Sequence, residues 1–306
     1  MNKIDLLEKY IIEISEPQIS FKRNAPLSEY CSFGIGGKAD IIIWPDSVKS
    51  LKLIIEYLQL YDIRYDIFGN ASNVLFDDSG FSGAIIFTTK MNKVEVFPET
   101  DMIIAECGVS LTHLSNVALN NNLSGLEFAY GIPGSLGGAV FMNAGAYGGQ
   151  ISDVLSSSTF LSRNGNIFEI DYDCHFFDYR KSVFQNNNSI ILSSVFKLNK
   201  GSYSSIKEIM LHNMSERKKK QPLEYPSAGS VFKRYPGYYT GKIIEELGLK
   251  GFSVGGAMVS EKHAGFIINY DNASAADVMK LIEIIKAKVK DKYNISIEQE
   301  ILYIPN

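Results

Sequence analysis

The stretch EFAYGIPGSLGGAVFMNAGAYGG, Glu127 to Gly149, is dominated by glycine and alanine and holds a single charged residue. A run of small residues lets the backbone approach a flat or extended ligand closely. Its glycines do not have the G-x-G-x-x-G spacing of a dinucleotide-binding turn. The stretch therefore predicts a close-approach surface for a large cofactor. The alternative is a glycine-rich packing corner.

Two further segments were considered as anion sites. FGNASNVLF, Phe68 to Phe76, places small hydrogen-bonding residues between two expected strands, where consecutive N–H groups can converge on a diphosphate. A plain tight turn is the alternative there. SFGIGGKAD, Ser32 to Asp40, contains Gly-Gly-Lys, but Ala39 stands where a P-loop needs serine or threonine, which argues against a nucleotide triphosphatase.

Composition sets the broad class. A chain of 306 residues is long for one domain, so we expect two or three compact units. The net charge of −4 lacks the cationic excess that nucleic-acid binding requires. The three cysteines, Cys31, Cys107 and Cys174, are far apart and predict neither a metal site nor a disulfide framework. No apolar run is long enough to cross a membrane, and we expect a cytoplasmic protein.

Hydrophobic periodicity predicts a mixed α+β chain. Helices are expected at residues 2–14, 47–61, 111–123, 202–220, 241–251 and 274–294. Strands are expected at 39–45, 65–69, 83–89, 93–98 paired with 102–108, several short ones between 156 and 198, and a final strand at 295–304. Ser274 is expected to cap the 274–294 helix together with Asp277.

PSAGSVFKRYPGYY, Pro226 to Tyr239, holds Ser230 between small residues, two cations and a run of tyrosines. Together with GLEFAYGIPGSLGGAVFMNAGAYGG, this stretch resembles the signature of the UDP-N-acetylenolpyruvoylglucosamine reductase family. The same family is resembled by GNASN, by YRKSVF at Tyr179–Phe184, by Gly248–Asn269 and by the closing IEQEILYI. In order, these segments span the chain from about Ser32 to Ile304. They resemble the shorter subclass, which lacks an extra tyrosine-bearing loop.

The resemblance implies a fold. It is a vanillyl-alcohol-oxidase/PCMH-type FAD-binding fold of two subdomains plus a C-terminal α+β substrate-binding domain. Residues 1–90 would form the first subdomain, with the strand at 300–306 returning to it. Residues 91–218 would form the second, and 219–299 the substrate-binding domain.

It also implies an activity. NADPH would reduce FAD, and the reduced flavin would pass a hydride to the β-carbon of UDP-N-acetylglucosamine enolpyruvate while a proton adds at the α-carbon. The product would be UDP-N-acetylmuramate, a peptidoglycan precursor. The implied protein is a monomer with a small-molecule substrate and with no metal, nucleic-acid or membrane partner.

Three residues match the family's catalytic set. Ser230 matches its proton donor, and Arg180 its active-site arginine, whose fork can bind a carboxylate bidentately. Glu300 matches its catalytic glutamate. Sequence reasoning does not separate Glu300 from Glu298, two residues earlier on the expected strand, but the family's register does. Individually, a turn hydroxyl, a surface ion pair and a solvated strand residue are the alternatives.

Binding residues follow from the same resemblance. The predicted FAD-binding residues are Gly69, Asn70, Ala71, Ser72, Asn73, Gly131, Ile132, Pro133, Gly134, Ser135, Gly138, Ala139, Asn143, Ala144, Gly145 and Ala146. The predicted substrate-binding residues are Lys233, Arg234, Tyr238 and His263. For His263 a packed, hydrogen-bonded histidine is the alternative. For the basic run at 217–220, a solvated helix end is favoured over phosphate binding.

The sequence departs from the family pattern at three positions. Ala71 stands where glycine is common, and its methyl group demands a compatible backbone angle. Gly34 stands where family members often have a cation. Family members usually have a proline directly after FKR, whereas here Tyr235 comes first and Pro236 follows it. These departures bear on affinities more than on the reaction.

Two other functions were weighed. A sugar or alcohol oxidase on the same fold often tethers FAD through a histidine near the diphosphate loop, and the nearest downstream histidine here is His113. A catalytically inactive paralogue that senses a UDP-sugar or a flavin is the other. Flavin content and turnover separate the three.

Overall fold

A computed structural model describes residues 2–14, 19–187 and 189–306. The chain forms two compact units. Unit 1 comprises residues 1–22, 41–70 and 83–216, and unit 2 comprises 23–40, 71–82 and 217–306. Strands β1 (Ser20–Pro26), β2 (Lys38–Trp44) and β5 (Phe81–Phe87) each run from one unit into the other. The three-part division expected from the sequence stays a prediction.

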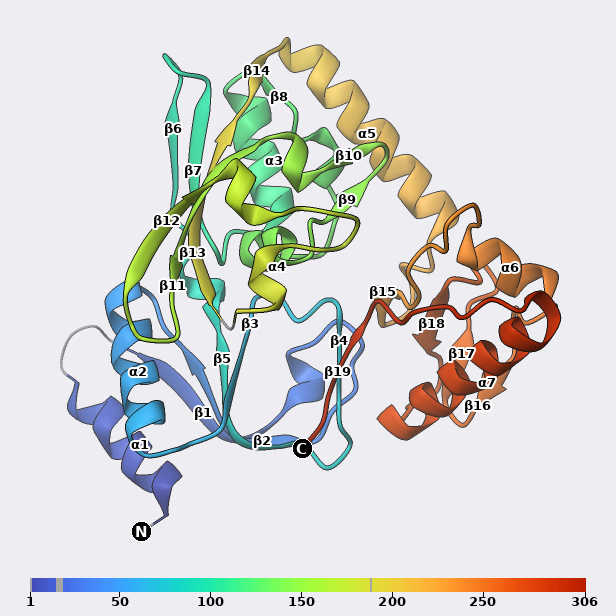
Figure 1. Cartoon of the computed structure of the whole chain (residues 1–306), viewed down its shortest axis with the longest axis horizontal. Coiled ribbons are helices and arrows are strands. Elements are labelled where there is room, and N and C mark those ends of the chain that lie inside the picture. Colours follow the sequence, from blue (N-terminus) through green and yellow to red (C-terminus); the bar gives the residue numbers. More distant parts are fainter. Residues whose placement is uncertain (1, 15–18, 188) are drawn as a thin grey trace. The chain divides into compact units, whose positions relative to one another are not determined.

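Unit 1 is built around a five-stranded antiparallel sheet in the order β12-β11-β13-β7-β6 (Figure 1). Its strands are β6 (Val94–Phe97), β7 (Met102–Glu106), β11 (Leu155–Leu161), β12 (Ile167–Asp171) and β13 (Ile190–Lys197). Its helices are α1 (Lys3–Glu13), α2 (Val48–Leu60), α3 (Leu111–Asn120) and α4 (Leu136–Phe141). The shorter strands are β3 (Tyr65–Phe68), β8 (Leu123–Ser124), β9 (Gly145–Ala146), β10 (Gly149–Gln150) and β14 (Asn199–Lys200). β3 pairs in parallel with residues 84–87 of β5.

One continuous apolar core holds unit 1 together. Helix α2 contributes Leu51, Ile54 and Leu58, which recur at helical spacing and are fully buried. Strand β7 contributes Ile103 and Ala105 to the same cluster. Burying each large aliphatic side chain stabilises the unit by about 1.5–3 kcal/mol. Helix α5 (Tyr203–Lys220) begins in this unit.

Unit 2 contains an antiparallel sheet in the order β15-β18-β17-β16. Its strands are β15 (Ser227–Ser230), β16 (Ser253–Val254), β17 (Ala257–Val259) and β18 (Phe266–Asn269). Helices α6 (Thr240–Glu246) and α7 (Ala275–Tyr293) lie beside it (Figure 1). A separate parallel pair joins β19 (Leu302–Ile304) to β4 (Val74–Phe76).

The secondary structure confirms most of the expected elements. The expected 93–98/102–108 hairpin is present as β6 and β7, with Phe97 opposite Met102. The long final strand was wrong, because regular pairing is confined to β19 and to one isolated bridge at Gln299. Helix α4 was missed, because its glycines disfavour helix and the helix is held by neighbouring main-chain bonds instead.

No helix in the described parts of the chain combines the length and the apolar character that crossing a bilayer demands.

The Ser274 cap of α7 is confirmed, and it generates the first prediction. The Ser274 side chain accepts from the N–H of Asp277 at 3.0 Å, and the Asp277 carboxylate accepts from the N–H of Ser274 at 3.0 Å. Replacing Ser274 with alanine should lower the free energy of unfolding by about 1 kcal/mol. Urea denaturation measures it, with Ser296→Ala at an exposed position as the control. Equal midpoints for the two variants would contradict the assignment.

Candidate active site

Two of the predicted cofactor segments meet within unit 1. A Cβ added to Gly69 would overlap the Oγ of Ser135 and lie 2.7 Å from its Cβ, so the contact admits only glycine. Ser135 itself is fixed by its neighbours, because Leu111 N–H donates to Gly134 O at 3.0 Å and Leu136 N–H to Val109 O at 2.8 Å. Protein contacts therefore hold the two segments against each other.

The turn before α4 presents main-chain donors. Among the described residues, the N–H groups of Gly134 and Ser135 have no hydrogen-bond acceptor. Gly131 is in the left-handed region at φ +81° and donates to the Thr112 Oγ1 at 3.2 Å. Unused N–H groups on a backbone with little side-chain cover suit an anionic ligand such as a diphosphate.

The rest of the GNASN segment passes into unit 2. Ala71 is buried and has φ +43°, a left-handed angle that costs an L-residue roughly 1–2 kcal/mol. Its carbonyl accepts from Ser32 N–H at 3.3 Å. The strain explains why glycine suits this position better. Asn73 donates through Nδ2 to Glu300 O at 3.2 Å, which ties the segment to the C-terminal chain.

Residues 171–185, here named the Arg180 loop, are bound to the glycine-rich segment of unit 1. The Ser182 Oγ and the Gln185 Nε2 both donate to the carbonyl oxygen of Phe141, at 2.8 and 3.0 Å. Asn143 Nδ2 donates to Asp178 O at 3.1 Å. These bonds hold the loop against the end of α4.

Asn143 is almost fully buried, with φ +42°, and its amide has protein partners on both sides. Besides the bond to Asp178, its Oδ1 accepts from Ser152 N–H at 3.0 Å. A direct contact between its side chain and a cofactor stays a prediction. In this structure the side chain positions the Arg180 loop.

Arg180 has an unusual backbone angle and a defined side-chain position. Its φ is +54°, uncommon for a residue that is not glycine. The Nη2 donates to the carbonyl of Gly145 at 3.1 Å, and the guanidinium lies 5.1 Å from the ring centre of Tyr179. The predicted arginine thus adjoins the predicted cofactor residues Gly145 and Ala146.

Ser230 ends a bulged strand in unit 2. Ser227 faces Ile268 and Ser230 faces Phe266, so β15 uses three steps where β18 uses two. The extra residue is accommodated by Gly229 at φ +79°. A bulge of this kind turns the following side chain away from the regular alternation. Ser230 is half-buried.

The structure distinguishes the two glutamates that sequence reasoning could not. Glu300 is half-buried, and its N–H donates to Val231 O at 2.7 Å, one residue from Ser230. Glu298 is exposed and forms a 3.1 Å ion pair with Lys233. Exposed pairs of this kind contribute little to stability.

The remaining predicted substrate residues lie in or near the exposed turn after β15. Arg234 stacks its guanidinium 5.1 Å from the ring centre of Tyr239. Tyr238 is half-exposed, with its ring centre 6.2 Å from that of Tyr235. The turn presents aromatic faces and cations to solvent. The basic run at 217–220 closes helix α5, as the helix dipole favours. Residues 218–220 are exposed, as expected for a solvated helix end, but Arg217 is buried and donates to the Gln221 Oε1 at 3.0 Å.

His263 is a hydrogen-bonded residue of a tight turn. Its Nδ1 accepts from Gly265 N–H at 3.0 Å, and its ring lies edge-on to Phe266 at 5.0 Å. Burial lowers the pKa of His263, with Lys250 adding to the effect. The ring is therefore neutral at physiological pH, with its proton on Nε2.

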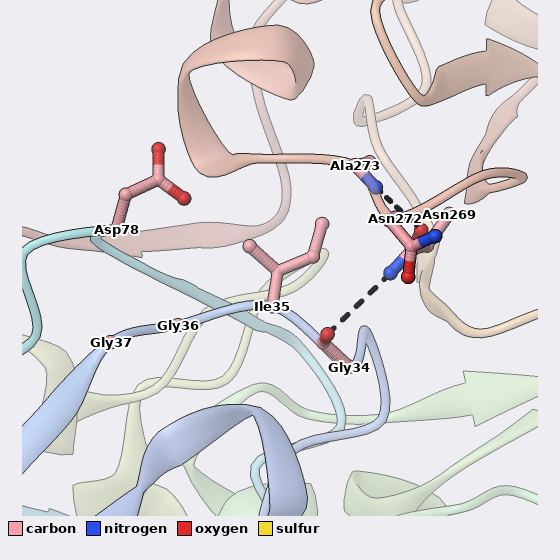
Figure 2. A pocket seen from close by; sticks show the side chains of 8 residues that line it. All are labelled: Gly34, Ile35, Gly36, Gly37, Asp78, Asn269, Asn272 and Ala273. Atoms are coloured by element: carbon pink, nitrogen blue, oxygen red, sulfur yellow. Dashed lines mark hydrogen bonds between the residues drawn. The ribbon is translucent and has the colours of Figure 1, made fainter.

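A hollow in unit 2 includes none of the predicted site residues (Figure 2). It is lined by Gly34, Ile35, Gly36, Gly37, Asp78, Asn269, Asn272 and Ala273. Asn269 spans it, accepting from Ala273 N–H at 2.8 Å and donating to Gly34 O at 3.5 Å. Asp78 accepts from the first two N–H groups of α7. The side chains of Asn269 and Asp78 in this hollow thus already hydrogen-bond to the main chain of the protein. No cluster of metal-ligating side chains occurs among the described residues.

Sequence reasoning missed the residues that position the Arg180 loop. Ser182 lies inside the YRKSVF motif, so its place beside Arg180 in that motif was the signal that could have identified it. Gln185 carried no signal, because its partner Phe141 lies 44 residues away in the sequence.

Known proteins resemble the chain over most of its length. Residues 221–304 match the C-terminal domain of UDP-N-acetylenolpyruvoylglucosamine reductase, and residues 39–171 match an FAD binding domain. The UDP-N-acetylenolpyruvoylglucosamine reductase of Clostridium novyi is 45% identical, covering 98% of this chain and 97% of its own. That of Caldanaerobacter subterraneus is 47% identical over 91% of each chain.

Solved structures agree. UDP-N-acetylenolpyruvylglucosamine reductase from Thermus caldophilus superposes with a TM-score of 0.80 at 30% identity, covering 94% of this chain and all of the other. An alkyldihydroxyacetonephosphate synthase matches at TM-score 0.50 and 15% identity, over 64% of this chain and 40% of its own, which shows the fold alone. The α+β, PCMH-type FAD-binding fold expected from the sequence is confirmed.

The left-handed φ of Ala71 predicts that an alanine-to-glycine substitution changes stability in opposite directions at two positions. Replacing Ala71 with glycine removes the left-handed penalty and should stabilise the protein by about 1 kcal/mol, after glycine's larger chain entropy is counted. The same substitution at exposed, helical Ala276 should destabilise it by about 1 kcal/mol. Thermal denaturation measures both. A lower melting temperature for Ala71→Gly would refute the strain.

Proposed function

The chain belongs to the UDP-N-acetylenolpyruvoylglucosamine reductase family, FAD- and NADPH-dependent oxidoreductases of peptidoglycan precursor synthesis, and from that premise we propose its reaction and the residues that perform it. The substrate is UDP-N-acetylglucosamine enolpyruvate and the product UDP-N-acetylmuramate. A hydride adds to the enolpyruvyl β-carbon and a proton to the α-carbon. One hydride and one proton, together two electrons and two protons, thus saturate the double bond.

The observation that carries the proposal is the placement of Ser230. The bulge at Gly229 takes Ser230 out of the regular strand alternation, and the main chain of Glu300 is bonded next to it. A hydroxyl and a carboxyl group on neighbouring chain segments can together deliver a proton. A plain core strand needs neither the left-handed glycine nor the bulge.

The cofactor fits the residues present. The unused N–H groups of Gly134 and Ser135 and the contact of Gly69 with Ser135 suit the diphosphate of FAD. Gly145, which has no side chain, and Ala146, which has only a methyl group, leave space beside Arg180. When bound, FAD accepts a hydride from NADPH and supplies it to the substrate.

Arg180 binds the substrate carboxylate in this proposal. Addition of hydride at the β-carbon places negative charge on the α-carbon and the carboxylate. A guanidinium aimed at that charge stabilises it without reorganising solvent. The bond to Gly145 and the anchored loop hold the guanidinium in advance, which reduces the entropy lost on binding.

Ser230 gives the proton to the α-carbon. Glu300 orients the Ser230 hydroxyl or returns a proton to it. A serine hydroxyl is a weak acid, so a neighbouring carboxyl group is needed to make the transfer efficient. Glu298 is left outside this role because it is exposed and paired with Lys233. The cations and rings of Lys233, Arg234 and Tyr238 would contact the UDP part. Action as a cytoplasmic monomer stays a prediction.

An anaerobic experiment tests the proposal. The flavin is first reduced with NADPH and then mixed with UDP-N-acetylglucosamine enolpyruvate, and the flavin absorbance near about 450 nm is followed. The wild-type flavin should reoxidise as UDP-N-acetylmuramate appears. Ser230→Ala should reduce its flavin normally but reoxidise at least about a hundredfold more slowly. Ser227→Ala, at the other end of β15, is the matched control. A Ser230→Ala protein that turns over at the wild-type rate would remove serine from the proton step.

The contact between Gly69 and Ser135 predicts a steric rescue. Gly69→Ala should lower the flavin bound per protein, because the new methyl group displaces Ser135. Adding Ser135→Gly makes room and should restore flavin content. Flavin absorbance relative to protein absorbance measures both. Normal flavin in Gly69→Ala would show that the two segments need not meet.

A further inference from the structure

A buried polar chain connects the Arg180 loop to the central sheet of unit 1. His175 ends a short 3-10 helix, Tyr172–His175, and its side chain is fully buried. Its Nε2 lies 2.9 Å from the Oγ of Ser158 on β11, which lies 2.8 Å from the Oγ of Ser194 on β13. All three residues are buried, so each bond forms away from water.

The partners of His175 fix its tautomer. Nδ1 lies 3.0 Å from Asp171 O and 3.2 Å from Tyr172 O, and carbonyl oxygens only accept. Nδ1 therefore carries the proton. Nε2 accepts from Ser158, whose oxygen accepts in turn from Ser194. Every polar atom of the chain is satisfied when the imidazole is neutral.

The ring also packs into the loop that follows it. It stacks on Phe177 at 4.9 Å and meets the edge of Phe184 at 5.7 Å. The main chain turns sharply over residues 176–181. Phe176 is left-handed at φ +47° with its side chain 72% exposed, and Asp178 and Lys181 close a turn at 3.1–3.2 Å. A bulky residue in that conformation persists only where its surroundings enforce it.

We propose that His175 is a positioning residue for Arg180: the imidazole fastens the loop to β11 and β13 on one side, while Phe141 and Asn143 fasten it on the other. The inference rests on the role proposed above for Arg180. No contact between His175 and a substrate or cofactor is involved. The ring acts by holding the backbone angles of residues 176–180 that aim the guanidinium at Gly145.

Protonation should weaken this hold. The ring faces Ser158 from β11 and, through it, Ser194 from β13. It faces Phe184 from the following 3-10 helix and Phe177 from the loop. The charged group that acts on it is Asp171 at the end of β12. A second ring proton would point at the Ser158 hydroxyl, which must then rotate.

Burial lowers the pKa of His175 below its usual 6.5, despite the opposing carbonyls of Asp171 and Tyr172. As the pH falls below about 6.5, the unfolded chain binds a proton that the folded ring refuses. His175 should therefore contribute a fall in unfolding free energy below that pH. His175→Phe should lack this contribution.

The test compares His175→Phe with His212→Phe, the same change at an exposed position. Hydrogen exchange of the amides at 176–182 in the FAD-bound protein should quicken in His175→Phe alone. Flavin reduction by NADPH should be unchanged, while reoxidation by the enol ether should slow by about ten- to a hundredfold. In an Arg180→Lys background the same substitution should add little further slowing. His175→Gln, which keeps a donor and an acceptor, should recover part of the rate.

Ser158→Ala provides a second route if His175→Phe does not fold. It removes one hydroxyl and should quicken the same amides by a smaller factor. Unchanged exchange and an unchanged reoxidation rate in these variants would overturn the inference. So would equal slowing of both half-reactions, or a full effect of His175→Phe in the Arg180→Lys background. Failure of the wild-type protein to reduce the enol ether would instead refute the proposed function, while the exchange data would still test the hold on the loop.

Discussion

Two carbonyl groups, one at the end of helix α4 and one in the strand β9 that follows it, organise the candidate site of unit 1. The Phe141 carbonyl accepts hydrogen bonds from the side chains of Ser182 and Gln185, and the Gly145 carbonyl accepts one from Arg180. A last-turn carbonyl of a short helix has no partner within the helix, so it is free to accept from elsewhere. The small residues that follow α4 let the Arg180 loop come close enough to use these acceptors. The glycine-rich run therefore serves both the predicted cofactor and the arginine.

Some residues with proposed roles depart from ordinary backbone geometry, although most of the left-handed residues described in the chain lie elsewhere. Ala71, Asn143 and Arg180 are left-handed, and Gly229 shapes the bulge before Ser230. The left-handed angles of Ala71, Asn143 and Arg180 each cost free energy and persist because their surroundings hold them. Gly229 takes its angle without a steric penalty. Local rules tend to be broken where a protein needs a particular geometry for function.

The sequence predicted the regular elements best. Helix α7 shows its apolar spacing and its Ser274 cap openly, and the hairpin of β6 and β7 shows alternation around a polar turn. Those signals are local, so they can be read from a short window. Helix α4 was missed because its glycines give the opposite local signal.

The roles of the site residues stay a prediction, and the residues that support them could not be predicted from the sequence. Family motifs named Arg180, Ser230 and Glu300. No window of sequence could show that Gln185 reaches Phe141, 44 residues away, or that Ser158 reaches His175 across 17. Nor could a window of sequence show that Glu298 forms an ion pair with Lys233, a partner 65 residues away.

The most direct test of this account is the position of Arg180 in a crystal structure of the FAD-bound protein without substrate. The account requires the loop to be ordered, with the Arg180 Nη2 within hydrogen-bond distance of Gly145 O and the Asn143 amide bonded to Asp178 O. That result would show that the guanidinium is placed before substrate arrives. A disordered loop, or an arginine turned away from Gly145, would show that substrate binding creates the arrangement and would contradict the central claim.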